Sequence, residues 1–165
     1  MLGGIPPNST VGETFRQDLV TRYDQWWTVR MNNVELDGDD IKDSGIGYAI
    51  LDTGTSLLYL GTEDYENFVN KLTSQVPSID CTSGIYCFSN TEYCEDITPY
   101  MSDLTIQLGE NHYTMPPETY TFSRSKNWRQ KKCTVAISYT DSSSGVYILG
   151  DTFLRNFVTT FDYKN

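Results

Sequence analysis

The segment YAILDTGTSLLYL, residues 48–60, constrains the fold of this chain more than any other part of the sequence. Two apolar runs enclose Asp-Thr-Gly-Thr-Ser, so we expect one strand to enter the loop and another to leave it. An aspartate at the end of an apolar strand needs donors that hold its charge partly out of water. Gly54 permits a sharp turn that brings a backbone N–H to Asp52, and Thr55 offers a hydroxyl. This environment is typical of a carboxylate that acts as an acid or a base.

The loop also has a plainer interpretation, in which Asp52 only caps a turn between two strands. A bare Asp-Thr-Gly supports that interpretation in most sequences. The full run of five residues is expected by chance in on the order of one in ten thousand chains of this size. Thr53 is β-branched and adds stiffness to the same loop. The sequence therefore predicts a functional carboxylate at Asp52.

Alternation of apolar and polar residues through most of the chain predicts an all-β fold. Residues 25–41 predict two strands separated by a turn at Asn32 and Asn33, then a hairpin at Asp37 and Gly38. Residues 104–108 place three apolar side chains on one face before a turn at Gly109. Further strands are expected within 133–149, and a last one at 157–163.

A single long amphipathic helix is expected after the Asp-Thr-Gly loop. Thr62 is a candidate N-cap, and Pro77 stops the helix. Apolar residues recur between them at helical spacing: Tyr65, Phe68, Val69, Leu72 and Val76. A shorter helix is expected at 152–156. Because no linker or repeat interrupts the chain, residues 1–165 are expected to form one domain.

The charge balance argues against nucleic-acid and membrane-surface partners. Twelve Lys and Arg oppose 22 Asp and Glu, which gives a formal net charge of −10. An acidic surface repels phosphate backbones and anionic lipid. No apolar run reaches the roughly 18 residues of a membrane helix. A soluble acidic protein fits, and an acidic working compartment would suit it.

The four cysteines allow three pairings into two disulfides, and the residues alone do not choose between them. Their spacing is not that of paired Cys-x-x-Cys metal knuckles, and the single His112 adds little, so no metal and no cofactor are expected. Asn8 begins an Asn-x-Ser/Thr glycosylation sequon. Disulfides and a sequon together favour the secretory route, either secreted or lysosomal. No signal peptide is visible, which suggests that an N-terminal part precedes this sequence.

The sequence resembles the C-terminal lobe of pepsin-like aspartic proteases. AILDTGTSLLYL resembles the active-site segment of that lobe, and YILGDTFLRNFVTTFDY resembles its later part. LGGI at residues 2–5 resembles the crossing between the two lobes, and WWTVRMNNVELDG the strands before the catalytic loop. The resemblance covers nearly the whole chain. It implies a half-barrel lobe over residues 1–165, with an interlobe crossing segment at 1–10.

The resemblance also implies roles for individual residues. Asp52 would be one of two catalytic aspartates, and Thr53, Gly54 and Thr55 would support its loop. Substrate contacts would come from Ile50, Gly54, Thr55, Ser56 and Trp26, with Trp27 as an alternative wall or plain core residue. Ile148, Leu149 and Gly150 would pack beneath the loop, and Asp151 would either tune acidity or cap the short helix. The resemblance implies the disulfide Cys94–Cys133, whereas Cys81–Cys87 is expected as an additional pair on a surface loop, a departure from the family.

A protease of this kind needs a second aspartate, and this sequence contains only one Asp-Thr-Gly. The resemblance implies that an N-terminal lobe of the same protein supplies it, with peptides or proteins as substrates. One alternative is a non-catalytic lobe that binds a peptide or carbohydrate in the cleft. Another is pairing of two copies, which the charge of each copy disfavours. The isolated lobe is expected to be inactive, and unpaired strand backbone predicts weak self-association.

Overall fold

The computed structural model describes residues 12–21, 25–42, 45, 47–82, 85–123, 133–140 and 146–162. The expected crossing segment at 1–10 and the sequon at Asn8 lie outside these residues. The strands are β1 Thr28–Leu36, β2 Asp39–Asp40, β3 Gly47–Leu51, β4 Leu58–Gly61, β5 Phe88–Ser89, β6 Leu104–Leu108, β7 Asn111–Met115, β8 Thr121–Ser123, β9 Cys133–Val135, β10 Ile137–Thr140 and β11 Val146–Leu149. The helices are α1 Thr62–Gln75, α2 Cys94–Ile97, α3 Asp151–Leu154 and the 3-10 turns η2 Thr98–Tyr100 and η3 Pro117–Thr119.

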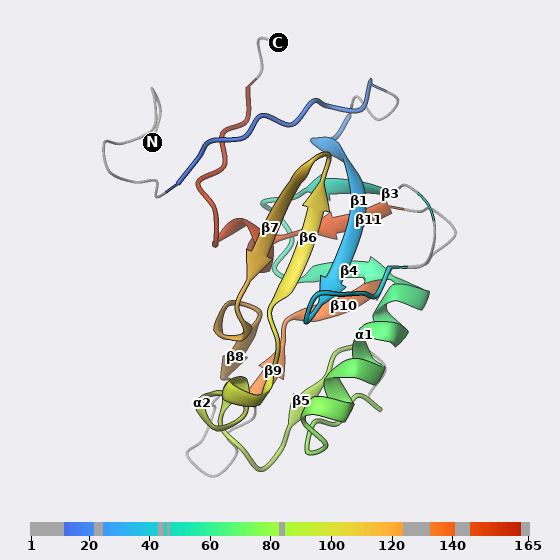
Figure 1. Ribbon diagram of the computed structural model, residues 1–165. Helices are drawn as coiled ribbons and strands as arrows, with labels where there is room; N and C mark the ends of the chain where they lie inside the picture. Colours follow the sequence, from blue (N-terminus) through green and yellow to red (C-terminus); the bar gives the residue numbers. More distant parts are fainter. Residues whose placement is uncertain are drawn as a thin grey trace.

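Most of the described chain belongs to one large mixed sheet. Its strands follow the order β10-β4-β11-β3-β1-β6-β7, and the short strand β2 pairs with β1 outside this order. A separate, smaller sheet has the order β5-β9-β8. It lies at the same end of the molecule as α2 (Figure 1). The strands of the described residues do not close into a barrel. This architecture confirms the expected mostly β lobe.

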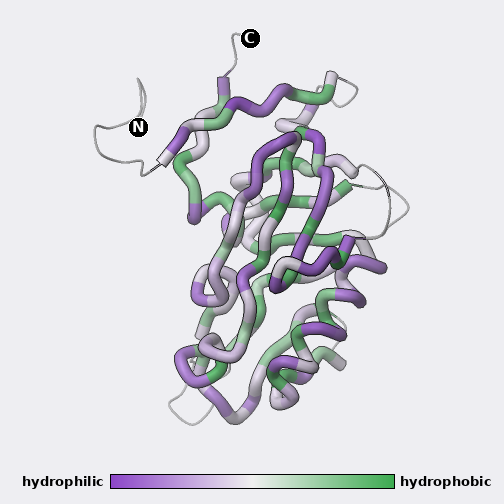
Figure 2. The backbone as a smooth tube through the Cα atoms, in the orientation of Figure 1, coloured by the Kyte–Doolittle hydropathy of each residue, from purple (hydrophilic) through white to green (hydrophobic). Residues whose placement is uncertain are grey.

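The core lies between the large sheet and helix α1. Apolar side chains on one face of α1 recur at helical spacing, and Tyr65, Phe68 and Leu72 are buried against the sheet. Figure 2 shows the same pattern as alternating hydrophilic and hydrophobic bands along α1. Strand β6 buries Leu104, Ile106 and Leu108 from one face, as the sequence predicted. Its hairpin with β7 turns at Gly109, whose φ of 57° favours glycine.

The two-residue hairpin between β1 and β2 is also confirmed. Glu35 pairs with Asp40, and Leu36 with Asp39, which leaves Asp37 and Gly38 as the turn. Both turn residues have positive φ, 60° and 74°. Asp-Gly is the sequence that such a turn prefers, because aspartate and glycine tolerate this conformation.

The prediction of a turn at Asn32 and Asn33 is wrong. Strand β1 runs unbroken through both residues and carries a bulge between Met31 and Asn33. The Asn33 side chain accepts a hydrogen bond from the N–H of Val34 and donates to Asp40 across the hairpin. Local bonding by asparagine can shape a bulge as readily as a turn, and the pairing of β1 with β6 decides between them.

Two helix boundaries also differ from the expectation. Gly61 is the N-cap of α1, and Thr62 is already helical. The Thr62 hydroxyl donates to the carbonyl of Thr140 on β10 instead of capping its own helix. Gly150, not Asp151, caps α3, which begins one residue earlier than expected. The sequence did not predict α2, which begins after Tyr93. The Tyr93 N–H donates to the Asp96 carboxylate, and the Asp96 N–H donates to the Tyr93 carbonyl.

The last expected strand is absent from residues 157–162 of the described chain. A strand needs neighbouring backbone to pair with, and no described strand pairs with this segment. Aromatic contacts hold it instead: the Phe157 ring lies 5.3 Å from that of Tyr113, and the Phe161 ring 5.0 Å from that of Trp27. Figure 1 shows this segment passing close to the end of the lobe where β1 begins.

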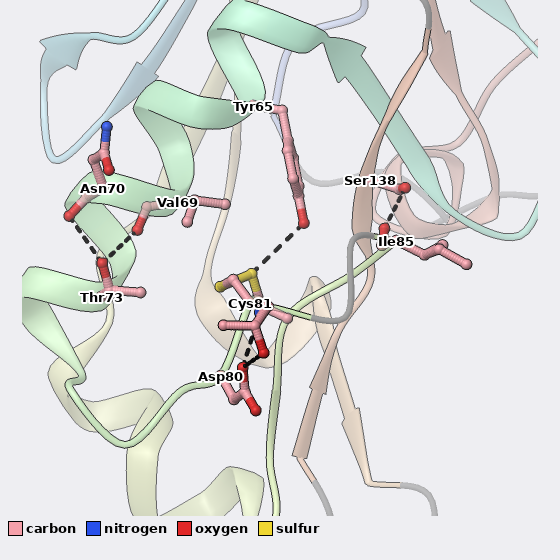
Figure 3. Close-up of a disulfide and its surroundings, with 10 residues drawn as sticks. Tyr65, Val69, Asn70, Thr73, Asp80, Cys81, Ile85 and Ser138 are labelled. Carbon is pink, nitrogen blue, oxygen red and sulfur yellow. Dashed lines mark hydrogen bonds between the residues drawn. A yellow bond between two sulfur atoms is a disulfide. The ribbon is translucent and has the colours of Figure 1, made fainter.

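Two disulfides are present: Cys94–Cys133, which the resemblance implied, and the expected additional pair Cys81–Cys87. Cys94–Cys133 joins the start of α2 to β9, and Cys81–Cys87 closes a short loop after α1. Cys87 is fully buried, and its sulfur lies 3.6 Å from the hydroxyl of Tyr65 on α1 (Figure 3). The disulfide loop is therefore anchored to the core and not only cross-linked to itself.

A buried carboxylate ties α1 to β11 and supplies a stability test. Asp64 lies in the first turn of α1 and accepts a hydrogen bond from the Tyr147 hydroxyl. Removing this donor with Tyr147→Phe should lower the free energy of unfolding by about 1–3 kcal/mol, because a buried carboxylate loses a partner. Urea denaturation measures the change. The exposed Tyr100→Phe should change it by less than about 0.5 kcal/mol. Equal effects would contradict a stabilising role for this bond.

Candidate functional site

The Asp52 loop begins where β3 ends and β4 has not yet started. Strand β3 lies between β1 and β11, so its last residues are held from both sides. Leu51 donates its N–H to the carbonyl of Trp27, and Asp52 donates its N–H to the carbonyl of Leu149. The backbone of Asp52 therefore continues the sheet ladder. This rigidity explains how an otherwise exposed loop can hold one side chain in place.

Two donors within the loop bind separate oxygens of the Asp52 carboxylate. The Gly54 N–H donates to Oδ1 at 2.9 Å, and the Thr55 hydroxyl donates to Oδ2 at 2.5 Å. The hydrogen bond from Thr55 is the larger cause that lowers the Asp52 pKa below its usual value of 3.8, and that from Gly54 is the next. Partial burial raises the pKa of Asp52 and so opposes the two hydrogen bonds. Because its pKa is lowered, Asp52 of the chain alone is an ionised carboxylate at neutral pH.

Gly150 lies directly beneath the loop. A Cβ atom built on Gly150 would lie 2.3 Å from the carbonyl oxygens of both Thr55 and Leu57, so no larger residue fits without a shift. The next two residues then bind the loop: the Asp151 N–H donates to Thr55 O at 2.7 Å, and the Thr152 N–H to Ser56 O at 3.1 Å. The carbonyls of the loop are thus satisfied by the start of α3.

Of the predicted residues Ile148, Leu149 and Gly150, Gly150 lies against the loop and the Leu149 carbonyl accepts the N–H of Asp52. Leu149 is fully buried, whereas Ile148 is half-buried and pairs in register with Ile50. Sequence reasoning missed Thr152, which is buried and adds a side-chain bond from its hydroxyl to Ser56 O at 2.9 Å. A threonine two residues after Ile-Leu-Gly was the available signal, but spacing alone did not show its partner.

The other residues predicted to support the loop or contact substrate are more exposed. Thr53 and Ser56 are exposed at the loop surface, and Trp26 is 57% exposed just before β1. Trp27 is half-buried, and its carbonyl fixes Leu51. Among the described residues, no group of three or more His, Cys, Asp or Glu is arranged to hold a metal ion. No helix in the described part of the chain is long and apolar enough to cross a membrane.

A mostly β fold with a hydrogen-bonded aspartate on a loop packed against Gly150 is consistent with a pepsin-like lobe. Residues 1–165 match the model of the eukaryotic aspartyl protease family. The chain therefore belongs to that family.

Individual relatives agree with this family. The chain is 29% identical to embryonic pepsinogen of Gallus gallus over 165 residues, which are 100% of this chain and 39% of the relative. It is 27% identical to pepsin A of Sus scrofa, over 100% of this chain and 40% of the relative. It is 27% identical to cathepsin D of Bos taurus, over 98% of this chain and 39% of the relative. The chain thus spans about two fifths of the length of these curated relatives.

The close approach at Gly150 gives a first prediction for the site. Gly150→Ala should lower the free energy of unfolding by about 1–3 kcal/mol, because the added methyl group meets two carbonyl oxygens. It should also shift the NMR signal of the Gly54 N–H, since the loop above must move. Gly61→Ala is the control, because its Cβ would meet only ordinary contacts, the nearest 3.6 Å away at the Tyr147 hydroxyl. An unchanged Gly54 signal in Gly150→Ala would contradict the close packing of Gly150 against the Asp52 loop.

The hydrogen bond from Thr55 gives a second prediction. Thr55→Val should raise the Asp52 pKa towards 3.8, measured by NMR titration of the carboxyl carbon. A lowered native pKa stabilises the fold above the unfolded pKa, and that stability is lost as pH falls through the native pKa. The variant should therefore lose less stability than the parent chain on acidification below about pH 4.

Asp80 provides a matched control for the titration. It accepts hydrogen bonds from the hydroxyl and the N–H of Thr82, and they lower its pKa in the same way. Thr82→Val should raise the pKa of Asp80 and leave that of Asp52 unchanged. A shift of Asp52 in the Thr82 variant, or none in the Thr55 variant, would contradict the assigned cause.

Proposed function

We propose that this chain is one lobe of an aspartic endopeptidase and that Asp52 is one of its two catalytic carboxylates. The observation that carries the proposal is the placement of Asp52 on a braced loop, with one donor on each oxygen. Membership of the aspartyl protease family supports the same reaction. The second carboxylate and most of the cleft would come from an N-terminal lobe of the same protein.

The proposed mechanism uses two aspartates that share one proton. Like charges a few ångströms apart cannot both ionise, so one pKa rises and the other stays low, as aspartic proteases illustrate. The ionised carboxylate takes a proton from a water, and the resulting hydroxide attacks the peptide carbonyl. The protonated carboxylate gives its proton to the carbonyl oxygen. The tetrahedral diol then collapses: the carboxylate that took the proton from water gives it to the leaving nitrogen, and a hydroxyl of the diol returns its proton to the other carboxylate. The pair again holds one proton, and no covalent enzyme intermediate forms.

The residues of this lobe would hold the reactants in that geometry. Gly54 and Thr55 keep the Asp52 carboxylate oriented, while Ile50, Ser56 and Trp26 contact the substrate chain. Thr53 would bond across to the loop of the other lobe. Two disulfides are consistent with a secretory protein, secreted or lysosomal, because such bonds persist in oxidising compartments.

A non-catalytic lobe that binds a peptide or carbohydrate is the second candidate. Its basis is that this sequence contains one Asp-Thr-Gly, and a cleft can bind an extended ligand without a second catalytic carboxylate. Such a protein would keep the shape of the cleft and bind extended ligands without hydrolysing them.

Cleavage of acid-denatured globin by the two-lobed protein, with and without pepstatin, tests the proposal. Asp52→Asn should reduce pepstatin-sensitive kcat by at least about 10³-fold, because the shared-proton pair is lost. Asp80→Asn is the matched control, since Asp80 has similar donors away from the loop, and it should retain activity. Pepstatin binding without cleavage by the parent protein would favour the non-catalytic candidate. Activity of the isolated chain that rises with the square of its concentration would show that two copies assemble the pair.

A further inference from the structure

A row of side chains crosses the large sheet beside Asp52. In direct register, Thr28 of β1 pairs with Ile50 of β3, Ile50 with Ile148 of β11, Ile148 with Tyr59 of β4, and Tyr59 with Ser138 of β10. Residues paired directly across neighbouring strands point to the same face of a sheet. Asp52 follows Ile50 by two residues, so the same alternation places it on this face.

This face of the sheet is the one that remains open in the middle. Ile50, Ile148 and Tyr59 are half-buried, whereas Ala49, Leu58 and Leu149 on the opposite face are fully buried in the core. Two branched aliphatic side chains and one aromatic ring therefore form an uncharged surface that starts next to Asp52. Such a surface suits apolar side chains of an extended peptide.

The far end of the row lies against the main chain of Ile85. Ser138 is 2% exposed, and its hydroxyl donates to the carbonyl of Ile85 (Figure 3). The same segment is fixed at Cys87, which is disulfide-bonded and whose carbonyl accepts the N–H of Val135. The backbone of Ile85 is thus held at a defined place beside the row.

The Ile85 side chain itself is not part of the core. It is 61% exposed, and Figure 3 shows it pointing away from the disulfide. The hydrogen bond to Ser138 and the nearby disulfide restrain the main chain of this residue and leave its side chain exposed. An apolar side chain that a rigid loop presents to solvent loses little entropy when a ligand covers it.

We propose that Ile85 is a specificity-determining residue, which contacts an apolar side chain of the substrate about four residues from the scissile bond. The proposal rests on the proposed protease function. Three strand spacings separate Ile50 from Ser138, or about 14 Å. An extended peptide advances about 3.3–3.6 Å per residue, so it covers that distance in about four residues. The Cys81–Cys87 disulfide then serves to fix this contact.

Cleavage of a positional peptide series by the two-lobed protein tests the proposal. An apolar residue is replaced by aspartate at each of five positions on either side of the scissile bond. One position, about four residues away, should lose about tenfold in kcat/KM in the parent protein, mainly through KM. Ile85→Ser should abolish the preference at that position alone. The control Tyr100→Ser removes another exposed apolar side chain, located on η2, and should change nothing.

A cross-linking measurement keeps the proposal decisive if the protein does not cleave peptides. A non-hydrolysable statine peptide carries a photoreactive phenylalanine four residues from the statine, in two versions that place it on either side. One version should label the described loop residues around Ile85, and Ile85→Ser should reduce that labelling. Labelling there without cleavage by the parent protein would reject the protease proposal and retain this contact. Labelling elsewhere, or an unchanged preference in Ile85→Ser, would overturn the contact.

Discussion

The contact between Gly150 and the carbonyls of the Asp52 loop is the constraint on which the site depends. Asp52 follows the end of β3, and the loop must cross above the end of β11 before it joins β4. Only a residue without a side chain lets the two backbones approach this closely, since a Cβ would lie 2.3 Å from two oxygens. The N–H groups of Asp151 and Thr152 then satisfy the loop carbonyls. The aspartate is placed by backbone packing, and its side-chain bonds come afterwards.

The rest of the lobe makes that crossing rigid. Strand β11 is parallel to β3 and antiparallel to β4, so both arms of the loop are bonded to the same strand. The buried bond between Tyr147 and Asp64 fixes β11 to the first turn of α1, which follows β4 without a break. A displacement of β11 would therefore disturb both arms of the loop and the helix together. Stability and site geometry are coupled through one strand.

Local patterns predicted those parts of the molecule that local chemistry decides. Asp37 and Gly38 form the expected hairpin because their backbone preferences match the turn, and α1 follows its apolar spacing. The errors occur where a distant partner decides. Asn32 and Asn33 stay within β1 because β6 pairs alongside, and the Thr62 hydroxyl is drawn to β10. At the site, the donors to Asp52 follow from the motif, whereas the bond from Thr152 to Ser56 joins residues 96 positions apart and has no local signature.

The charge state of Asp52 explains why a lobe of this kind needs a partner to do acid–base chemistry. Both donors within the chain favour the ionised form, so they prepare a carboxylate that can accept a proton but hold none to give. Polarising a peptide carbonyl requires a proton held nearby at the same moment. A second carboxylate provides it, because the repulsion between two charges forces the pair to retain one proton, which belongs to the pair and not to either residue. In the proposed two-lobed enzyme, the hydrogen bonds of this lobe would keep one member of the pair basic, and the nearby carboxylate of the other lobe would let the pair hold a proton.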